Sequence, residues 1–300
     1  MTPVSPGIDV VRTRFGVLAY GPSGRLHGEA AVALLTLQAY APPDSDIVLL
    51  TDRPGHYRWF GNSITIDRLT PAIVSEWRGP LDDQFRPSLE ALRRLAADGA
   101  ADVVLADSDT MVRRDLRPLA DRLAAGAVFM HRREYSLGAP PRKGDRSLAH
   151  EIVGRTWQGI TPDGSSAMWN AGVVASSRRH GGIFDRTLAV FDQIRPVTRY
   201  FAVDQLACSI VLAAYAPIEE AAPWFDHYWA NRPWFNRAAE RFLSGALLEG
   251  LTPLDARERL KKQPLAGPLD GRAPWWLARL RRIISPAVPD DDHLAESDDR

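Results

Sequence analysis

The sequence predicts an α/β fold with a mostly parallel β-sheet flanked by helices. Short apolar, partly β-branched segments alternate with longer segments of helical periodicity through most of the chain. The connections between these segments are short, and no fixed-period repeat is found. A composition of 45% hydrophobic and 25% charged residues over 300 positions is that of an ordinary globular protein. This length allows one large domain or two small ones.

The first half of the chain alternates between strands and helices. Helix 27–41 is rich in Ala and Leu and is ended by Pro42-Pro43. Helix 85–97 places three leucines on one face and leads to an apolar, proline-free segment that is typical of an interior strand. Strands are expected at 15–20, 47–50, 63–66 and 102–106, and helices at 27–41 and 85–97.

The second half continues the alternation but contains one long polar segment. Helices are expected at 116–123, 184–194 and 204–214, with strands at 127–130 and, emerging from a loop, at 167–174. The segment 132–166 contains Pro140-Pro141 and several glycines. It has two interpretations, a flexible flap beside a site or an irregular surface excursion.

The ends of the chain differ in composition from its centre. We expect a leader at 1–13, one domain at 14–262, and an extension at 263–300 that holds a linker, a short amphipathic helix and a disordered acidic tail. As a helix, 275–284 separates apolar residues from arginines. Two interpretations stay open: peripheral contact with an anionic membrane surface, or packing on the protein's own domain or on a partner.

Charge and cysteine content exclude several classes of function. Lys and Arg together number 37, as do Asp and Glu, so no overall positive charge favours nucleic acid as a partner. The single Cys208 excludes a disulfide framework and a cysteine-rich zinc site. No secretory signal stands out, and every apolar stretch is shorter than the ~20 residues that span a bilayer. We therefore expect a cytoplasmic protein, and peripheral contact with the inner membrane face is one of the two open interpretations of 275–284.

Two acidic residues, Asp107 and Asp109, follow the expected strand 102–106. Residues i and i+2 of an extended segment point to the same side, at the strand end where α/β sheets bind ligands. Two adjacent carboxylates repel each other unless a cation lies between them, and their oxygens suit Mg²⁺ or Mn²⁺. The same tripeptide at 44–46 precedes a strand and is expected to cap a turn. The position at a strand exit therefore predicts the metal site.

Four segments together resemble the GT-A glycosyltransferases, most closely the family-8-like branch. They are ADSDTMVRRDL at 106–116, WNAGVV at 169–174, Asp204-Gln205 at a helix start, and DHYWANRP at 226–233. The resemblance covers about residues 14–235. It implies a GT-A (Rossmann-like) fold and a hexosyltransferase-like activity on a nucleotide-diphosphate-sugar, with a UDP-sugar as the first expectation. It also implies a carbohydrate, lipid-linked or protein acceptor, and it favours retention at the anomeric carbon.

The resemblance implies roles for the metal and sugar side of the site. Asp107 and Asp109 hold Mn²⁺ or Mg²⁺ on the donor diphosphate, and His227 completes the metal shell. Asn170, Asp204 and Gln205 line the sugar and acceptor side and are the expected catalytic residues. Blander roles stay open for three of them. His227 can simply pack among aromatic residues, Asn170 can stabilise a turn, and Asp204 can cap its helix, a role that is compatible with a sugar contact.

Four further residues are expected to contact the donor. Arg232 takes a cationic role where relatives have lysine, and Arg86 is matched to a basic residue that precedes the acidic motif in relatives. Guanidinium groups bind phosphate through paired hydrogen bonds. Tyr20 and Asp52, after the first two strands, are expected at the base and ribose. The branch often has acidic residues where Tyr20-Gly21 stands here.

Three alternatives compete with the transferase. A haloacid-dehalogenase-like phosphatase also has two aspartates after an apolar strand, but Met111 stands where that motif has Thr or Val. A nucleotidyltransferase on a related fold would use the same metal and nucleotide. An inactive nucleotide-sugar binding protein would have no need of both carboxylates.

Overall fold

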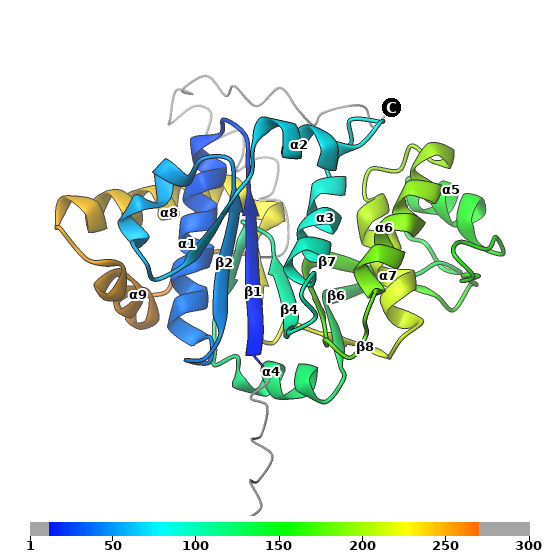
Figure 1. Ribbon diagram of the computed structural model, residues 1–300. Helices are drawn as coiled ribbons and strands as arrows, with labels where there is room; N and C mark the ends of the chain where they lie inside the picture. Colours follow the sequence, from blue (N-terminus) through cyan, green and yellow to red (C-terminus); the bar gives the residue numbers. More distant parts are fainter. Residues whose placement is uncertain (1–11, 270–300) are drawn as a thin grey trace, which may run out of the picture.

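A seven-stranded sheet forms the centre of the computed structural model, which describes residues 12–269 (Figure 1). The strand order is β3-β2-β1-β4-β7-β6-β8. The strands are β1 Arg12–Ala19, β2 Asp46–Thr51, β3 Thr65–Arg68, β4 Ala101–Ala106, β6 Val128–Ser136, β7 Ala167–Ser176 and β8 Ile218–Glu220. Only β7 pairs antiparallel with both of its neighbours; the other pairings of this sheet are parallel. The prediction of a mostly parallel sheet flanked by helices is confirmed.

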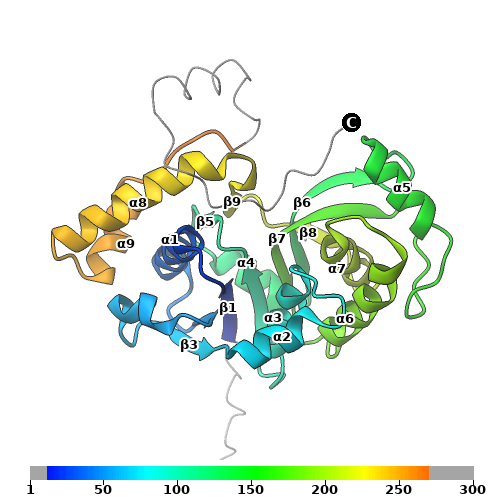
Figure 2. The same cartoon turned by 90° about the horizontal axis from the view of Figure 1, so that it is seen from above.

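Helices cover both faces of the sheet, as the view from above shows (Figure 2). One buried cluster joins α3, α6 and α7 to the sheet, and a second joins α1, α4 and α9 to its other face. Helix α8 lies along α1. The helices are α1 Gly24–Tyr40, α2 Pro71–Arg78, α3 Arg86–Leu95, α4 Arg117–Ala124, α5 Lys143–Ile152, α6 Ile183–Ile194, α7 Val203–Ala213, α8 Arg232–Leu248 and α9 Pro253–Lys262.

The interior of the sheet explains why these apolar segments form strands. Phe15, Val17 and Val104 have no exposed surface, and burial of this kind is worth roughly 1.5–3 kcal/mol for each large apolar side chain. The lack of a side chain at Gly16 lets α3 pack closely against β1, because a Cβ atom there would lie 2.3 Å from Cδ1 of Leu95. The predicted strands and helices of the first half are confirmed, with β3 beginning at Thr65 instead of Ser63.

The polar segment 132–166 differs from its prediction. Strand β6 continues to Ser136 because it pairs with the start of β7, and α5 occupies Lys143–Ile152. The interpretation of this segment as an irregular excursion is therefore wrong for α5, and its role as a flap beside a site stays a prediction. Leu148 and Ile152, four residues apart, are fully buried on one face of α5, and Asp145 accepts a hydrogen bond from the backbone N–H of Arg142 at its start.

A small second sheet, absent from the sequence analysis, lies at the carboxyl end of β4. Strand β5 (Thr110–Val112) pairs antiparallel with β9 (Phe225–His227), so that Thr110 stands opposite His227. The pairing joins segments more than a hundred residues apart. It brings the late histidine to the acidic motif.

Both ends of the chain reach beyond the described residues. Most of the predicted leader at 1–13, the helix at 275–284 and the acidic tail lie outside them. The domain boundaries at 14 and 262 stay predictions. Within residues 12–269, no helix has the length and apolar character required to cross a bilayer.

Candidate metal centre

Asp107 and Asp109 lie in the turn between β4 and β5, at the predicted strand exit. The Asp107 amide donates to the Gly172 carbonyl at 2.9 Å, which ties the turn to β7. Thr110 closes the turn, since its hydroxyl donates to the Asp107 carbonyl at 2.7 Å. Asp109 is buried and Asp107 is half-buried. The other copy of the tripeptide lies in a turn before β2, as predicted.

His227 meets this carboxylate pair. Its Nε2 atom lies 3.2 Å from Oδ1 of Asp109 and 3.8 Å from Oδ2 of Asp107. One ligand atom from each of the three side chains lies within 4.8 Å of the other two. Two carboxylate oxygens and one imidazole nitrogen form a ligand set that suits a divalent ion such as Mn²⁺. The predicted metal ligands are thus brought together.

Asn170 holds the histidine from behind. Its Oδ1 atom accepts the Gly172 amide at 3.0 Å, which identifies this atom as the carboxamide oxygen. The same oxygen lies 2.8 Å from Nδ1 of His227, so Nδ1 must carry the donated proton. With Nδ1 protonated, Nε2 faces the two carboxylates and is the nitrogen that can bind a metal.

A carboxylate that the sequence analysis missed holds two of the expected catalytic residues. Oε1 of Glu134 accepts the Asn170 side-chain amide at 3.2 Å, and Oε2 accepts that of Gln205 at 3.3 Å. Oε1 of Gln205 in turn accepts the Ala171 amide at 3.2 Å. Both carboxamides therefore direct oxygen to the backbone of β7 and nitrogen to Glu134. In the sequence, nothing distinguishes Glu134 from an ordinary surface acidic residue, so its role in the site could not be predicted.

Arg232 lies beside the metal group, at the start of α8. Its Nε atom is 3.5 Å from Oδ2 of Asp109. The same guanidinium forms two hydrogen bonds to Glu29, at 3.0 Å through Nε and 2.6 Å through Nη2. Glu29 is buried in α1 and was also missed. A charged residue inside an apolar Ala- and Leu-rich helix was the available signal.

Opposing effects set the pKa values in the group. Desolvation and the Asp109 charge raise the pKa of Asp107. Burial alone would raise the pKa of Asp109, but the His227 hydrogen bond and the nearby positive charges lower it. Burial would lower the pKa of His227, but Asp109 and Asp107 together raise it. The two carboxylates thus favour a proton on Nε2 of His227, and a cation that binds there competes with this proton.

Asp204 lies in the first turn of α7, and its predicted role as helix cap is wrong. The cap position is held by Ala202. Oδ1 of Asp204 is buried and has no hydrogen-bond partner among the described residues. Burial, reinforced by the Asp107 charge, raises the pKa of Asp204 to about 7. Such a carboxyl is suited to exchange a proton near neutral pH.

Tyr20 and Asp52 lie at the same edge of the sheet, after β1 and β2. Asp52 accepts the Gly21 amide with both oxygens, at 3.1 and 3.2 Å. The Tyr20 hydroxyl donates to the Gln84 carbonyl at 3.1 Å. Because β1, β2 and β4 are parallel, Tyr20 follows the strand next to β4, and Asp52 follows the next strand beyond it. Their proposed contact with the donor stays a prediction.

Arg86 is held away from the metal group. Its guanidinium donates twice to Asp192 of α6, at 2.8 and 3.0 Å, and once to Glu90 at 2.9 Å. A further bond to the Trp77 carbonyl engages the third nitrogen. This pattern ties α3 to α6. The structure therefore does not bring Arg86 together with the other predicted site residues.

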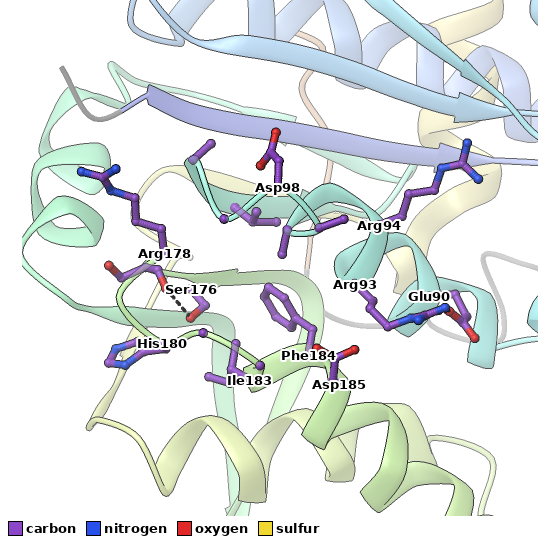
Figure 3. Close-up of a pocket in the computed structure, with 18 of the residues that line it drawn as sticks. Glu90, Arg93, Arg94, Asp98, Ser176, Arg178, His180, Ile183, Phe184 and Asp185 are labelled. Carbon is purple, nitrogen blue, oxygen red and sulfur yellow. Dashed lines mark hydrogen bonds and ion pairs between the residues drawn. The ribbon is translucent and has the colours of Figure 1, made fainter. Parts of the chain in front are cut away.

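A separate cavity of about 780 Å³ lies between α3 and α6 (Figure 3). It opens beside Ala101, the first residue of β4, and so lies at the opposite end of that strand from Asp107. Arg94, on its wall, is paired with Asp67 outside it. None of the metal-group residues lines this cavity.

Comparisons with known proteins return glycosyltransferases among solved structures. The galactosyltransferase LgtC, in complex with donor and acceptor sugar analogues, is 19% identical over 66% of this chain and 70% of its own, with a TM-score of 0.43. Mouse xyloside xylosyltransferase 1 is 13% identical over 70% of this chain and 85% of its own, with a TM-score of 0.45. The bifunctional glycosyltransferase WbbM is 15% identical over 72% of this chain and 40% of its own, with a TM-score of 0.44.

The sequence matches no protein-family model and no curated protein. These three solved structures are glycosyltransferases by name. Since their TM-scores lie below 0.5, a proposal of function must rest on the residues of this chain.

We predict that Gly172→Ala weakens metal binding without unfolding the protein. A Cβ atom at this position would lie 2.1 Å from Nδ1 of His227, so the imidazole must leave the position in which its Nε2 atom faces the carboxylates. We expect the Mn²⁺ dissociation constant, measured by titration calorimetry, to rise at least tenfold, within the range for disturbed ligand support. Gly181→Ala is the matched control, because nothing lies within 4 Å of its Cβ position. Equal Mn²⁺ affinity in both variants would contradict the role of Gly172.

We predict that Asp204→Asn stabilises the protein at alkaline pH. Folding raises the Asp204 pKa to about 7, above the unfolded value, so its stabilising contribution is full below about pH 4 and is lost as pH rises through 7. Asparagine stays neutral throughout. We expect the free energy of unfolding at pH 8, measured by urea titration with EDTA present, to rise by on the order of 1–2 kcal/mol. An equal change at pH 4 and pH 8 would contradict this assignment.

Proposed function

We propose that this protein is a metal-dependent glycosyltransferase. It moves a sugar from a nucleotide-diphosphate-sugar, a UDP-sugar in the first instance, to a carbohydrate, lipid-linked or protein acceptor, with retention at the anomeric carbon. One observation carries the proposal: Asp107, Asp109 and His227 converge at the carboxyl edge of the sheet with Arg232 beside them. A cluster of this kind suits a divalent ion and an anionic ligand together.

Asp107, Asp109 and His227 would hold Mn²⁺ or Mg²⁺. A divalent ion in this position supplies neutralisation of the charge that develops on a departing diphosphate, without any proton transfer. Arg232 adds a second positive group from α8. Its side chain is 44% exposed, and a guanidinium can bind phosphate oxygens through paired hydrogen bonds. These residues thus account for the leaving-group side of the reaction.

Asn170, Gln205 and Asp204 are the proposed catalytic residues on the sugar and acceptor side. Glu134 and the β7 backbone orient both carboxamides, and such orientation favours a single productive arrangement of a bound sugar. Asp204, with a pKa near 7, is the first candidate for a general base if the reaction inverts the anomeric carbon. Proton NMR of the product anomer distinguishes inversion from retention.

Tyr20 and Asp52 are proposed for the base and ribose of the donor, because they follow β1 and β2, whose carboxyl ends lie at the same edge of the sheet as that of β4. Arg86 is not included, since its guanidinium is fully engaged elsewhere. We further propose a cytoplasmic protein that touches the inner membrane face through 275–284. No nucleic-acid partner is proposed for a chain whose charges balance.

We predict slow, Mn²⁺-dependent hydrolysis of a UDP-sugar in the absence of an acceptor. The Asp109→Asn variant should lose at least a hundredfold in rate, because removing a ligand to the charge-neutralising ion costs several kcal/mol of transition-state stabilisation. Asp44→Asn, in the other copy of the tripeptide, is the matched control and should keep the wild-type rate. The rate is followed by chromatography of released UDP across a panel of sugar nucleotides.

The same assay separates the alternatives. Release of inorganic phosphate from a generic phosphoester would favour the phosphatase, and release of pyrophosphate from a nucleoside triphosphate would favour the nucleotidyltransferase. Donor binding without turnover would favour the inactive binding protein. Hydrolysis that is equally fast in wild type, Asp109→Asn and EDTA would refute the metal-dependent transferase.

A further inference from the structure

A buried carboxylate, Glu29, lies behind the metal group. Its side chain has no exposed surface, although it is charged and belongs to the apolar helix α1. Arg232 of α8 binds it through two nitrogens, and the Ser108 hydroxyl approaches its Oε2 atom at 3.5 Å. Ser108 is the residue between the two aspartates. Glu29 therefore links α1 to both the acidic motif and the neighbouring guanidinium.

The distances show which carboxylate holds the guanidinium. Arg232 lies 2.6 and 3.0 Å from the oxygens of Glu29 but 3.5 Å from the nearest oxygen of Asp109. In the described part of the chain, its remaining nitrogen, Nη1, has no hydrogen-bond partner. The planar guanidinium thus uses one edge for Glu29 and keeps other donors available.

The charges explain why this matters for a metal site. With all three carboxylates ionised and His227 neutral, Asp107, Asp109 and Glu29 carry three negative charges and Arg232 one positive charge, which leaves two negative charges for a divalent ion. If Glu29 were neutral, Arg232 would have only the aspartates as charged partners. It would then compete directly with the ion for Asp109.

We propose that Glu29 is a positioning residue that takes the close hydrogen bonds of Arg232 and so keeps the guanidinium from binding the two aspartates directly. The aspartates are thereby reserved for the divalent ion, and the outer edge of the guanidinium is reserved for the donor diphosphate. This inference rests on the proposed function and deepens it. It explains how the Arg232 guanidinium can lie 3.5 Å from Asp109, a proposed ligand of the divalent ion.

The test is a double-mutant cycle with Glu29→Gln, Arg232→Gln and the combined variant. Titration calorimetry measures the Mn²⁺ dissociation constant, and then that of UDP with Mn²⁺ saturating. Glu249→Gln is the matched control. It removes a carboxylate from another two-pronged pair, with Arg259, between the ends of α8 and α9. Thermal unfolding of every variant reports stability separately.

Glu29→Gln should weaken Mn²⁺ binding about tenfold, as for the loss of supporting partners in metal sites. Arg232→Gln should leave Mn²⁺ binding as tight as in the wild type or tighter, while UDP binding weakens about tenfold. The combined variant should recover Mn²⁺ affinity to within about threefold of the wild type but keep the UDP defect. Glu249→Gln should change neither constant.

Recovery in the combined variant distinguishes charge competition from mere loss of structure. Unchanged Mn²⁺ affinity in Glu29→Gln, or a combined variant that binds Mn²⁺ no better than Glu29→Gln, would overturn the inference and leave the proposed function standing. If Glu29→Gln alone fails to fold, Arg232→Gln tests the inference. Weaker Mn²⁺ binding in that variant would contradict competition between Arg232 and the ion for Asp109. A wild-type protein that binds no Mn²⁺ would overturn both the inference and the proposed function.

Discussion

The repulsion between Asp107 and Asp109 is the constraint around which this end of the molecule is organised. Two carboxylates in one turn, one of them buried, require compensating positive charge. His227 and Arg232 supply part of it and come from β9 and from the start of α8, more than a hundred residues later in the chain. The β5–β9 pairing brings both to the turn.

The reversed strand β7 provides the second layer of support. Because it runs against β4 and β6, its first residues reach the edge where its neighbours end. Asn170 and Gly172 therefore stand directly behind His227. Asn170 accepts its hydrogen bond, and the missing side chain of Gly172 leaves room for the imidazole ring. Glu134 of β6 and Gln205 of α7 complete this layer. The direction of one strand thus determines which nitrogen of the histidine faces the carboxylates.

The sequence could predict the parts of this site that depend on local pattern. An apolar run that ends in two acidic residues places Asp107 and Asp109, and alternating strands and helices predict the sheet. Glu29 and Glu134 could not be predicted in their roles, because their partners are set by tertiary contacts over long separations. Arg86 failed to join the site because Asp192 and Glu90 engage it. Helix α5 was not predicted, because the glycines and prolines around it indicate an irregular segment.

The most direct test of the metal centre is the position of a bound ion. Crystals grown with Mn²⁺ and UDP, measured at a wavelength where manganese scatters anomalously, locate the ion without assumptions about chemistry. The account predicts one strong anomalous peak about 2.0–2.6 Å from oxygens of Asp107 and Asp109 and from Nε2 of His227. A manganese peak elsewhere, or none at this position with UDP bound, would contradict it.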